Sequence, residues 1–144
     1  MDIRRITPGY AVSPQIAPED LETIRAEGFG AVICNRPDAE VPPAYQADAI
    51  ARAAEAAGLA FHVLPLTHQT MTPDNVARQA ELIGASDAPV LAYCASGTRC
   101  SVVWALGQAE TRSPDDVLSD AARAGYDLSG LRPTLEAVHA RAQG

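Results

Sequence analysis

The chain has 144 residues, of which 47% are hydrophobic and 20% charged, as expected for one globular domain with its own core. The formal charge of −7 argues against nucleic acid as a partner, because phosphate backbones need a basic surface that eleven scattered Lys and Arg do not supply. No apolar run of about eighteen residues exists, and no signal-peptide core follows the first arginines, so we expect neither a membrane span nor secretion. Three cysteines without a CxxC pair favour a reducing, cytoplasmic location over a disulfide scaffold or zinc site.

A helix, a glycine and then an apolar strand recur along the chain. The apolar periodicity predicts helices over residues 18–28, 47–58, 72–84, 101–109 and 131–142, with a further helix that opens at Ser113. Strands are predicted over residues 10–12, 29–34, 60–66 and 89–93. In the third helix, the side chains expected to face inward are Val76, Ala77, Ala80 and Ile83. Such alternation predicts a single domain over residues 1–144 of three-layer α/β type, with a mainly parallel sheet of four or five strands and helices on both faces.

The last predicted strand runs into a loop that has the composition of an anion-binding site. This loop, Cys94-Ala95-Ser96-Gly97-Thr98-Arg99, opens the next helix, so its backbone N–H groups should form a concave nest at a helix N-terminus. The same positive field and the Arg99 guanidinium favour the thiolate of Cys94. A buried small cysteine is the alternative interpretation. The combination of strand, cysteine, glycine-containing loop, arginine and helix favours a catalytic site, with Cys94 as nucleophile, Arg99 as its partner and the four residues between them binding an anionic substrate.

Five ordered segments, from about Tyr10 to the C-terminus, carry a resemblance to a known family. They are Ser13-Pro14-Gln15, Asn35-Arg36-Pro37-Asp38, Thr72-Pro73-Asp74, Tyr93 to Arg99, and Ala124 to Pro133. Together they resemble the phosphatase-like domain family named after beta-lactamase hydrolase-like proteins. The resemblance implies the fold of dual-specificity phosphatases, and for some members it implies sulfur transfer beside a persulfide dioxygenase, which would then be a partner.

The chemistry of the loop has two leading interpretations. Tyrosine phosphatases place a His before the Cys and five residues between Cys and Arg, whereas this chain has Tyr93 and four residues, a spacing similar to that of rhodaneses. A phosphatase also needs a general acid, and the region about thirty residues before Cys94 holds no carboxylate. We therefore favour a sulfurtransferase that carries sulfane sulfur as a Cys94 persulfide, with a phosphatase as the alternative. A third hypothesis is an inactive module that senses anions or oxidants, because family members commonly have Arg where this chain has Ala95.

Four further residues are candidates for auxiliary roles. Arg36 follows a parallel strand and would reach the same sheet edge as Cys94, as a second anion contact or as a solvated loop residue. Asp38 is the candidate for the general acid of a phosphatase, although turn formation explains this residue equally well. His68 could face the same edge of the sheet as Cys94. Cys100 stands where this family usually has Ser or Thr, and it could resolve a modified Cys94 by forming a disulfide or simply pack in the helix. We expect no metal site and no cofactor.

Overall fold

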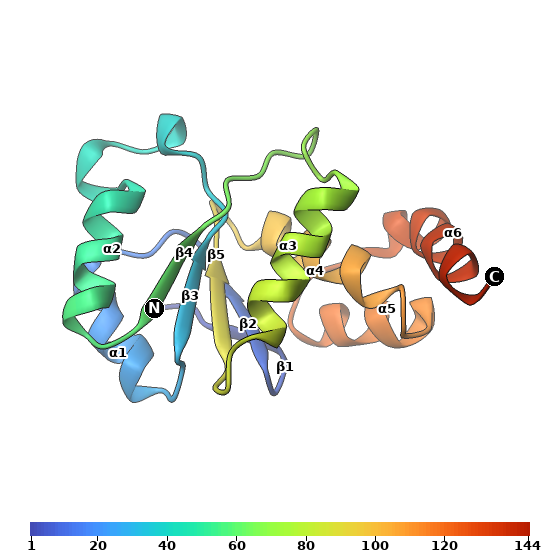
Figure 1. Cartoon of the computed structure of the whole chain (residues 1–144), viewed down its shortest axis with the longest axis horizontal. Coiled ribbons are helices and arrows are strands. Elements are labelled where there is room, and N and C mark those ends of the chain that lie inside the picture. The colour runs from blue at the N-terminus through green and yellow to red at the C-terminus, as the bar shows by residue number, and fades with distance from the viewer.

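Five strands form one sheet in the order β1-β2-β5-β3-β4 in the computed structural model, which describes residues 1–144 (Figure 1). Their bounds are β1 Arg4–Thr7, β2 Tyr10–Ser13, β3 Ala31–Cys34, β4 Ala60–Val63 and β5 Val90–Tyr93. All neighbouring strands pair in parallel except β1 and β2, which form an antiparallel pair at one edge. The predicted mainly parallel sheet is confirmed, with β1 as an additional strand that the sequence pattern did not predict.

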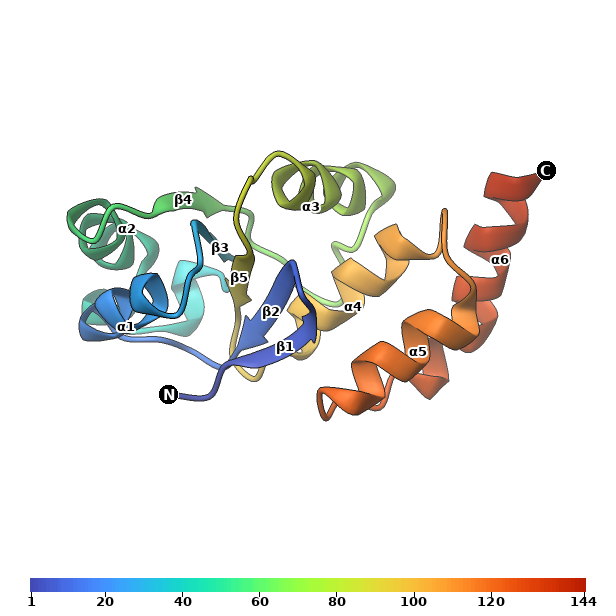
Figure 2. The same ribbon diagram turned by 90° about the horizontal axis from the view of Figure 1, so that it is seen from below.

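Helices cover both faces of the sheet, which confirms the predicted three-layer arrangement (Figures 1 and 2). Their bounds are α1 Leu21–Ala26, α2 Ala47–Ala56, α3 Pro73–Gly84, α4 Thr98–Gln108, α5 Pro114–Arg123 and α6 Arg132–Gln143. The first two helices lie on one face, α3 and α4 lie on the other, and α5 and α6 pack beyond α4. No helix combines the length and the apolar character that crossing a membrane would require.

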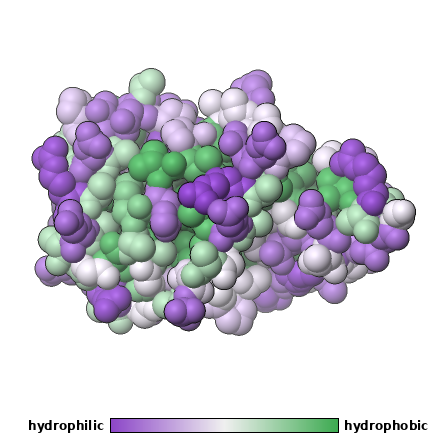
Figure 3. Space-filling model, in the orientation of Figure 1, coloured by the Kyte–Doolittle hydropathy of each residue, from purple (hydrophilic) through white to green (hydrophobic).

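The core consists of two apolar clusters separated by the sheet. Adjacent residues of one strand enter different clusters, because side chains alternate between the two faces: Leu91 packs with α1 and α2, whereas Ala92 packs on the side of α4 and α5. Strands β3 and β5 are fully buried, as expected for central parallel strands. The edge strand β4 is more exposed, and hydrophobic side chains gather over it in Figure 3.

Helix starts and ends follow the residues that predicted them. Gly28 and Gly58 adopt positive φ values of 99° and 79° just after α1 and α2, the left-handed conformation that ends many helices. Thr72 and Ser113 each accept a hydrogen bond at 3.2 Å from the backbone N–H three residues later, at the starts of α3 and α5. Local capping chemistry therefore sets these boundaries.

The predicted inward face of α3 is wrong in part. Ala77 and Ala80 are exposed, Val76 and Ile83 are half-buried, and the buried residues of α3 are Gln79 and Leu82. A polar side chain takes the central position because its amide has partners there.

Those partners form a buried hydrogen-bonded network that links α3 to the sheet. Gln79 Nε2 donates to Asn35 Oδ1 at 3.0 Å and to the Tyr10 hydroxyl at 3.2 Å, and Asn35 Nδ2 donates to Gln79 Oε1 at 2.9 Å. The Tyr10 hydroxyl in turn donates to the Cys100 carbonyl at 2.8 Å. The oxygen and the nitrogen of the Gln79 amide both have hydrogen-bond partners. Burial of Gln79 therefore does not carry the free-energy cost of an unpaired polar group.

Candidate active site

The loop that starts at Cys94 lies where three parallel strands end. The backbone N–H of Cys94 donates to the Ser13 carbonyl at 3.3 Å, and the N–H of Asn35 donates to the Tyr93 carbonyl at 2.9 Å. These bonds tie the loop to the carboxyl ends of β2 and β3, the edge at which α/β proteins bind ligands. The α4 helix begins at Thr98, directly after the loop.

Cys94 is buried and surrounded by hydrogen-bond donors. Its Sγ accepts a hydrogen bond from the Gly97 N–H at 3.1 Å, and only 1% of the residue is exposed. The pKa of Cys94 is lowered to about 5, chiefly by the hydrogen bond from the Cys100 thiol, with further help from the backbone N–H groups of Cys100, Gly97 and Ser96 and against the opposing effect of burial. The side chain is therefore a thiolate at neutral pH.

Cys100 supplies the donor because it remains protonated. It is fully buried in the first turn of α4, and burial raises its pKa well above the usual range, with the adjacent Cys94 raising it further. None of the three cysteines forms a disulfide, and Cys34 packs in the core. Cys100 thus replaces the hydroxyl expected at this position with a weaker donor, and its role in resolving a modified Cys94 stays a prediction.

Tyr126 holds the loop from the side of the helices. Its hydroxyl donates to the Ser96 carbonyl at 2.9 Å, and it stands directly over Gly97, whose φ is +91°. A methyl group on Gly97 would collide with that hydroxyl. Glycine is required here both for its backbone conformation and for the close approach of Tyr126.

Replacement of Gly97 by alanine should lower the free energy of unfolding by about 2 kcal/mol or more, because the left-handed conformation costs an L residue roughly 1–2 kcal/mol and the clash adds to it. Urea denaturation measures the change. The matched control is Gly84→Ala at the end of α3, where φ is not positive and nothing lies within 4 Å of the added methyl group. Equal stability of the two variants would contradict the role given to Gly97.

Arg99 is held in place by Glu40. Its Nη1 donates to Glu40 Oε2 at 2.8 Å and to the Leu66 carbonyl at 2.9 Å, and its Nη2 donates to Glu40 Oε1 at 2.8 Å. The hydrogen bond to Glu40, and to a smaller extent the nearby Cys94 thiolate, raise the pKa of Arg99. Two of the five guanidinium N–H groups, on Nε and Nη2, are not used by these bonds, and such a fork matches two oxygens of one anion.

A cavity of about 450 Å³ opens above this loop. Its lining includes three residues predicted to bind substrate, Ala95, Ser96 and Thr98, together with the predicted catalytic residue Arg99 and the predicted auxiliary residue His68; the other lining residues are Glu40, Thr67 and Gln69. Cys94 and Gly97 lie beneath these residues and are buried. No three His, Cys, Asp or Glu side chains come together as a group that could hold a metal ion.

The other two sequence candidates lie beside the cavity rather than in its lining. Asp38 accepts a hydrogen bond from the Ala47 N–H at 2.8 Å, so its carboxylate caps the start of α2. Arg36 donates from Nε to Glu40 Oε1 and from Nη1 to Gln15 Oε1, both at 3.2 Å. In this geometry Arg36 supports Glu40, and Asp38 is committed to a helix cap.

Sequence reasoning did not identify Glu40 or Tyr126 as site residues. Glu40 lies two residues after Asp38 in the same polar loop, and nothing in the spacing distinguishes the two acids. Tyr126 belongs to a segment that carries the family resemblance, which is the one signal that could have drawn attention to it. Both residues are distant from the loop in sequence and contact it only in the folded structure.

Comparison with known proteins identifies the family. Residues 2–111 match the family described as beta-lactamase hydrolase-like protein, phosphatase-like domain. The chain belongs to this family. A beta-lactamase hydrolase-like protein of Agrobacterium fabrum is 28% identical over 134 residues, which cover 92% of the chain but 31% of that relative. The chain therefore spans about a third of the length of this curated relative.

Solved structures place the fold among cysteine phosphatases. A candidate phosphatase from Neisseria meningitidis Z2491 is 34% identical, with a TM-score of 0.85 over 96% of this chain and 99% of that one. Tk-PTP in its active form shares the fold at 21% identity, with a TM-score of 0.70 over 97% of each chain. The cysteine-phosphatase-like fold predicted from the sequence is confirmed, and these relatives fit the phosphatase hypothesis better than the sulfurtransferase hypothesis.

Proposed function

We propose that this protein is a phosphatase that hydrolyses phosphate monoesters through a covalent phosphocysteine on Cys94. The observation that carries the proposal is the buried thiolate at the start of α4, with the Gly97 N–H 3.1 Å from its sulfur and Arg99 fixed nearby. An anion site of this kind stabilises charge on a transferring phosphoryl group. The 34% identity to a candidate phosphatase supports the same chemistry.

The reaction divides into two displacements. The Cys94 thiolate attacks phosphorus, a sulfur–phosphorus bond forms, and the ester oxygen departs with the electrons of the broken phosphorus–oxygen bond. Water then attacks phosphorus, the sulfur–phosphorus bond breaks, and inorganic phosphate and the thiolate are released. Arg99 and the loop N–H groups bind the phosphoryl oxygens in both steps.

The cavity favours substrates with an acidic leaving group. Glu40 is the carboxyl group in its lining, and the Arg99 guanidinium lowers the pKa of that carboxyl, so Glu40 is ionised at neutral pH and has no proton to donate. A phenolate departs without a proton far more readily than an alkoxide. We therefore assign aryl phosphates as the preferred substrate class, with His68, which lines the cavity, as the remaining side chain that could supply a proton.

The deciding experiment compares phosphate and sulfur chemistry on the same purified protein. Phenyl phosphate should be hydrolysed with release of inorganic phosphate, whereas treatment with thiosulfate or glutathione persulfide should leave no added sulfur on Cys94 by mass spectrometry. The opposite pair of results would restore the sulfurtransferase hypothesis. Inertness in both assays, with sulfate still bound at the loop, would favour the sensing module.

A further inference from the structure

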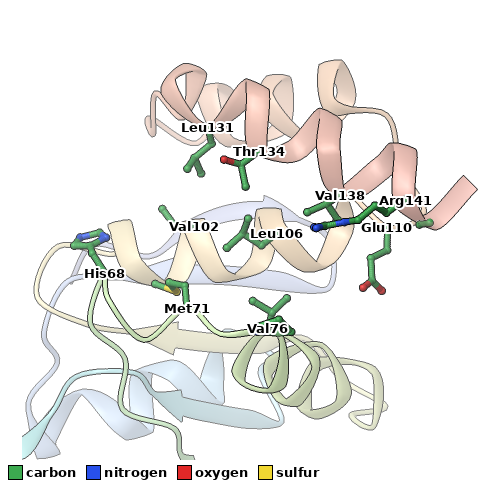
Figure 4. A pocket seen from close by; sticks show the side chains of 12 residues that line it. His68, Met71, Val76, Val102, Leu106, Glu110, Leu131, Thr134, Val138 and Arg141 are labelled. Carbon is green, nitrogen blue, oxygen red and sulfur yellow. The ribbon is translucent and has the colours of Figure 1, made fainter. Parts of the chain in front are cut away.

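A second and larger cavity borders the proposed active site. It has a volume of about 800 Å³, within the range of small-molecule sites, and its lining is mainly hydrophobic. Its walls come from α4, α6 and the start of α3, with Met71, Val76, Leu106 and Val138 among the lining residues (Figure 4). We call it the apolar groove. Each of these four side chains is only partly buried in the structure.

The groove begins at the catalytic cavity. His68 lines both of them. Figure 4 shows His68 at the end of the groove where α4 begins, Val102 and Leu106 along its floor, and Glu110 and Arg141 at the far end. Glu110 and Arg141 are charged and neither forms a side-chain ion pair, so the far end of the groove is polar. A ligand anchored at Cys94 would therefore meet an apolar surface in this direction.

We propose that the apolar groove binds the apolar part of the substrate, so that the preferred substrates are amphiphilic aryl phosphates. This proposal rests on the phosphatase function proposed above. The phosphate would sit at the loop between Cys94 and Arg99, and the apolar chain would pass His68 and lie against Val102, Leu106 and Val138. Continuity with the catalytic cavity favours a substrate over a second protein as the occupant, because the occupant would be joined to the group that reacts.

The groove also sets a length for the apolar chain. Thr134 and Arg141 lie seven residues apart on α6, which corresponds to about 10 Å along the helix at a rise of 1.5 Å per residue. An extended alkyl chain covers this distance with roughly eight methylene groups, since each C–C bond of about 1.5 Å advances a zigzag chain by slightly less than its length. A longer chain would reach the charged end at Glu110 and Arg141.

A series of phenyl, 4-butylphenyl, 4-octylphenyl and 4-dodecylphenyl phosphates tests this, at concentrations below micelle formation. We expect kcat/KM to rise about two- to fourfold per methylene group, because each buried methylene is worth up to about fourfold in affinity, and to level off near the octyl compound. Val138→Glu places a charge in the groove and should flatten this dependence. The matched control, Ala137→Glu, adds the same charge to an exposed neighbour on α6 that does not line the groove and should preserve the dependence.

The outcomes separate this proposal from the phosphatase function. Hydrolysis of phenyl phosphate with no dependence on chain length would overturn the groove proposal and leave the phosphatase standing. Absence of all hydrolysis would overturn the phosphatase. In that case calorimetric binding of 4-octylphenyl phosphate to the Cys94→Ser variant, lost in Cys94→Ser/Val138→Glu, would still support the groove. Self-association that Val138→Glu abolishes, without any chain-length effect, would instead identify a second copy as the occupant and overturn the proposal.

Discussion

Replacement of Cys94 by serine should reduce kcat/KM for phenyl phosphate by on the order of 10⁴-fold or more, because the loop would lose its nucleophile. At neutral pH the thiolate of Cys94 is ready to attack, whereas a serine hydroxyl in the same place remains protonated and has no general base beside it. The fold should survive, since the two side chains differ little in size. Steady-state kinetics measure the loss, and activity retained in Cys94→Ser would contradict every mechanism that uses this residue as nucleophile.

Variants of Cys100 provide the matched comparison. Cys100→Ser keeps a donor beside the sulfur and should retain the low pKa of Cys94. Cys100→Ala removes the donor that lowers this pKa most, so the pKa should rise from about 5 by roughly one to two units, because a hydrogen bond to a charged group is worth ~1.5–3 kcal/mol. A raised pKa decreases the thiolate fraction on the acid side of neutrality. Alkylation rates measured against pH should show this shift, and identical profiles for the two variants would exclude the donor role of Cys100.

The sequence predicted the fold well because its signals are local. Helix boundaries depend on residues adjacent in the chain, such as Gly28 after α1 or Ser113 before α5. The strand β1 gave no such signal, since two of its four residues are arginines and it pairs at the antiparallel edge. The face of α3 was misassigned because a hydropathy pattern counts Gln79 as polar, whereas the fold supplies it with buried partners.

The site could be predicted only as far as the loop itself. The strand, Cys94, Gly97 and the following helix are contiguous in the chain, so their relative arrangement could be predicted from local sequence. Contacts between residues that are distant in sequence leave no local pattern. Glu40 and Arg99 are separated by 59 positions in the chain, and Tyr126 and Ser96 by 30. The choice between sulfur and phosphate rested on a loop one residue shorter than in tyrosine phosphatases and on the absence of an upstream carboxylate. Both features describe the chain near the loop and not the side chains that surround it in the fold.

The second large effect should come from Arg99. Arg99→Lys should lower kcat/KM for phenyl phosphate by about 10²–10³-fold, because an ammonium group lacks the planar fork that can meet Glu40 on one edge and the phosphoryl oxygens on the other. Arg36→Lys is the matched control: Arg36 also contacts Glu40, yet it does not line the cavity, so its effect should be much smaller. Equal losses in both variants would mean that general positive charge at this edge of the sheet, and not the Arg99 fork, accounts for the activity.

Glu40→Gln distinguishes whether Glu40 positions Arg99 or competes with the substrate. Glu40 is bound to two Nη atoms of Arg99 and leaves the Nε edge of the guanidinium unused, so it orients that edge toward an anion at Cys94 instead of taking its place. Glutamine has a single acceptor oxygen and no charge, so it would hold Arg99 more loosely. We therefore expect KM for phenyl phosphate to rise about tenfold with the pH dependence of Cys94 alkylation little changed. A fall in KM would instead show that the carboxylate occupies the phosphate position in the free enzyme and that substrate must displace it.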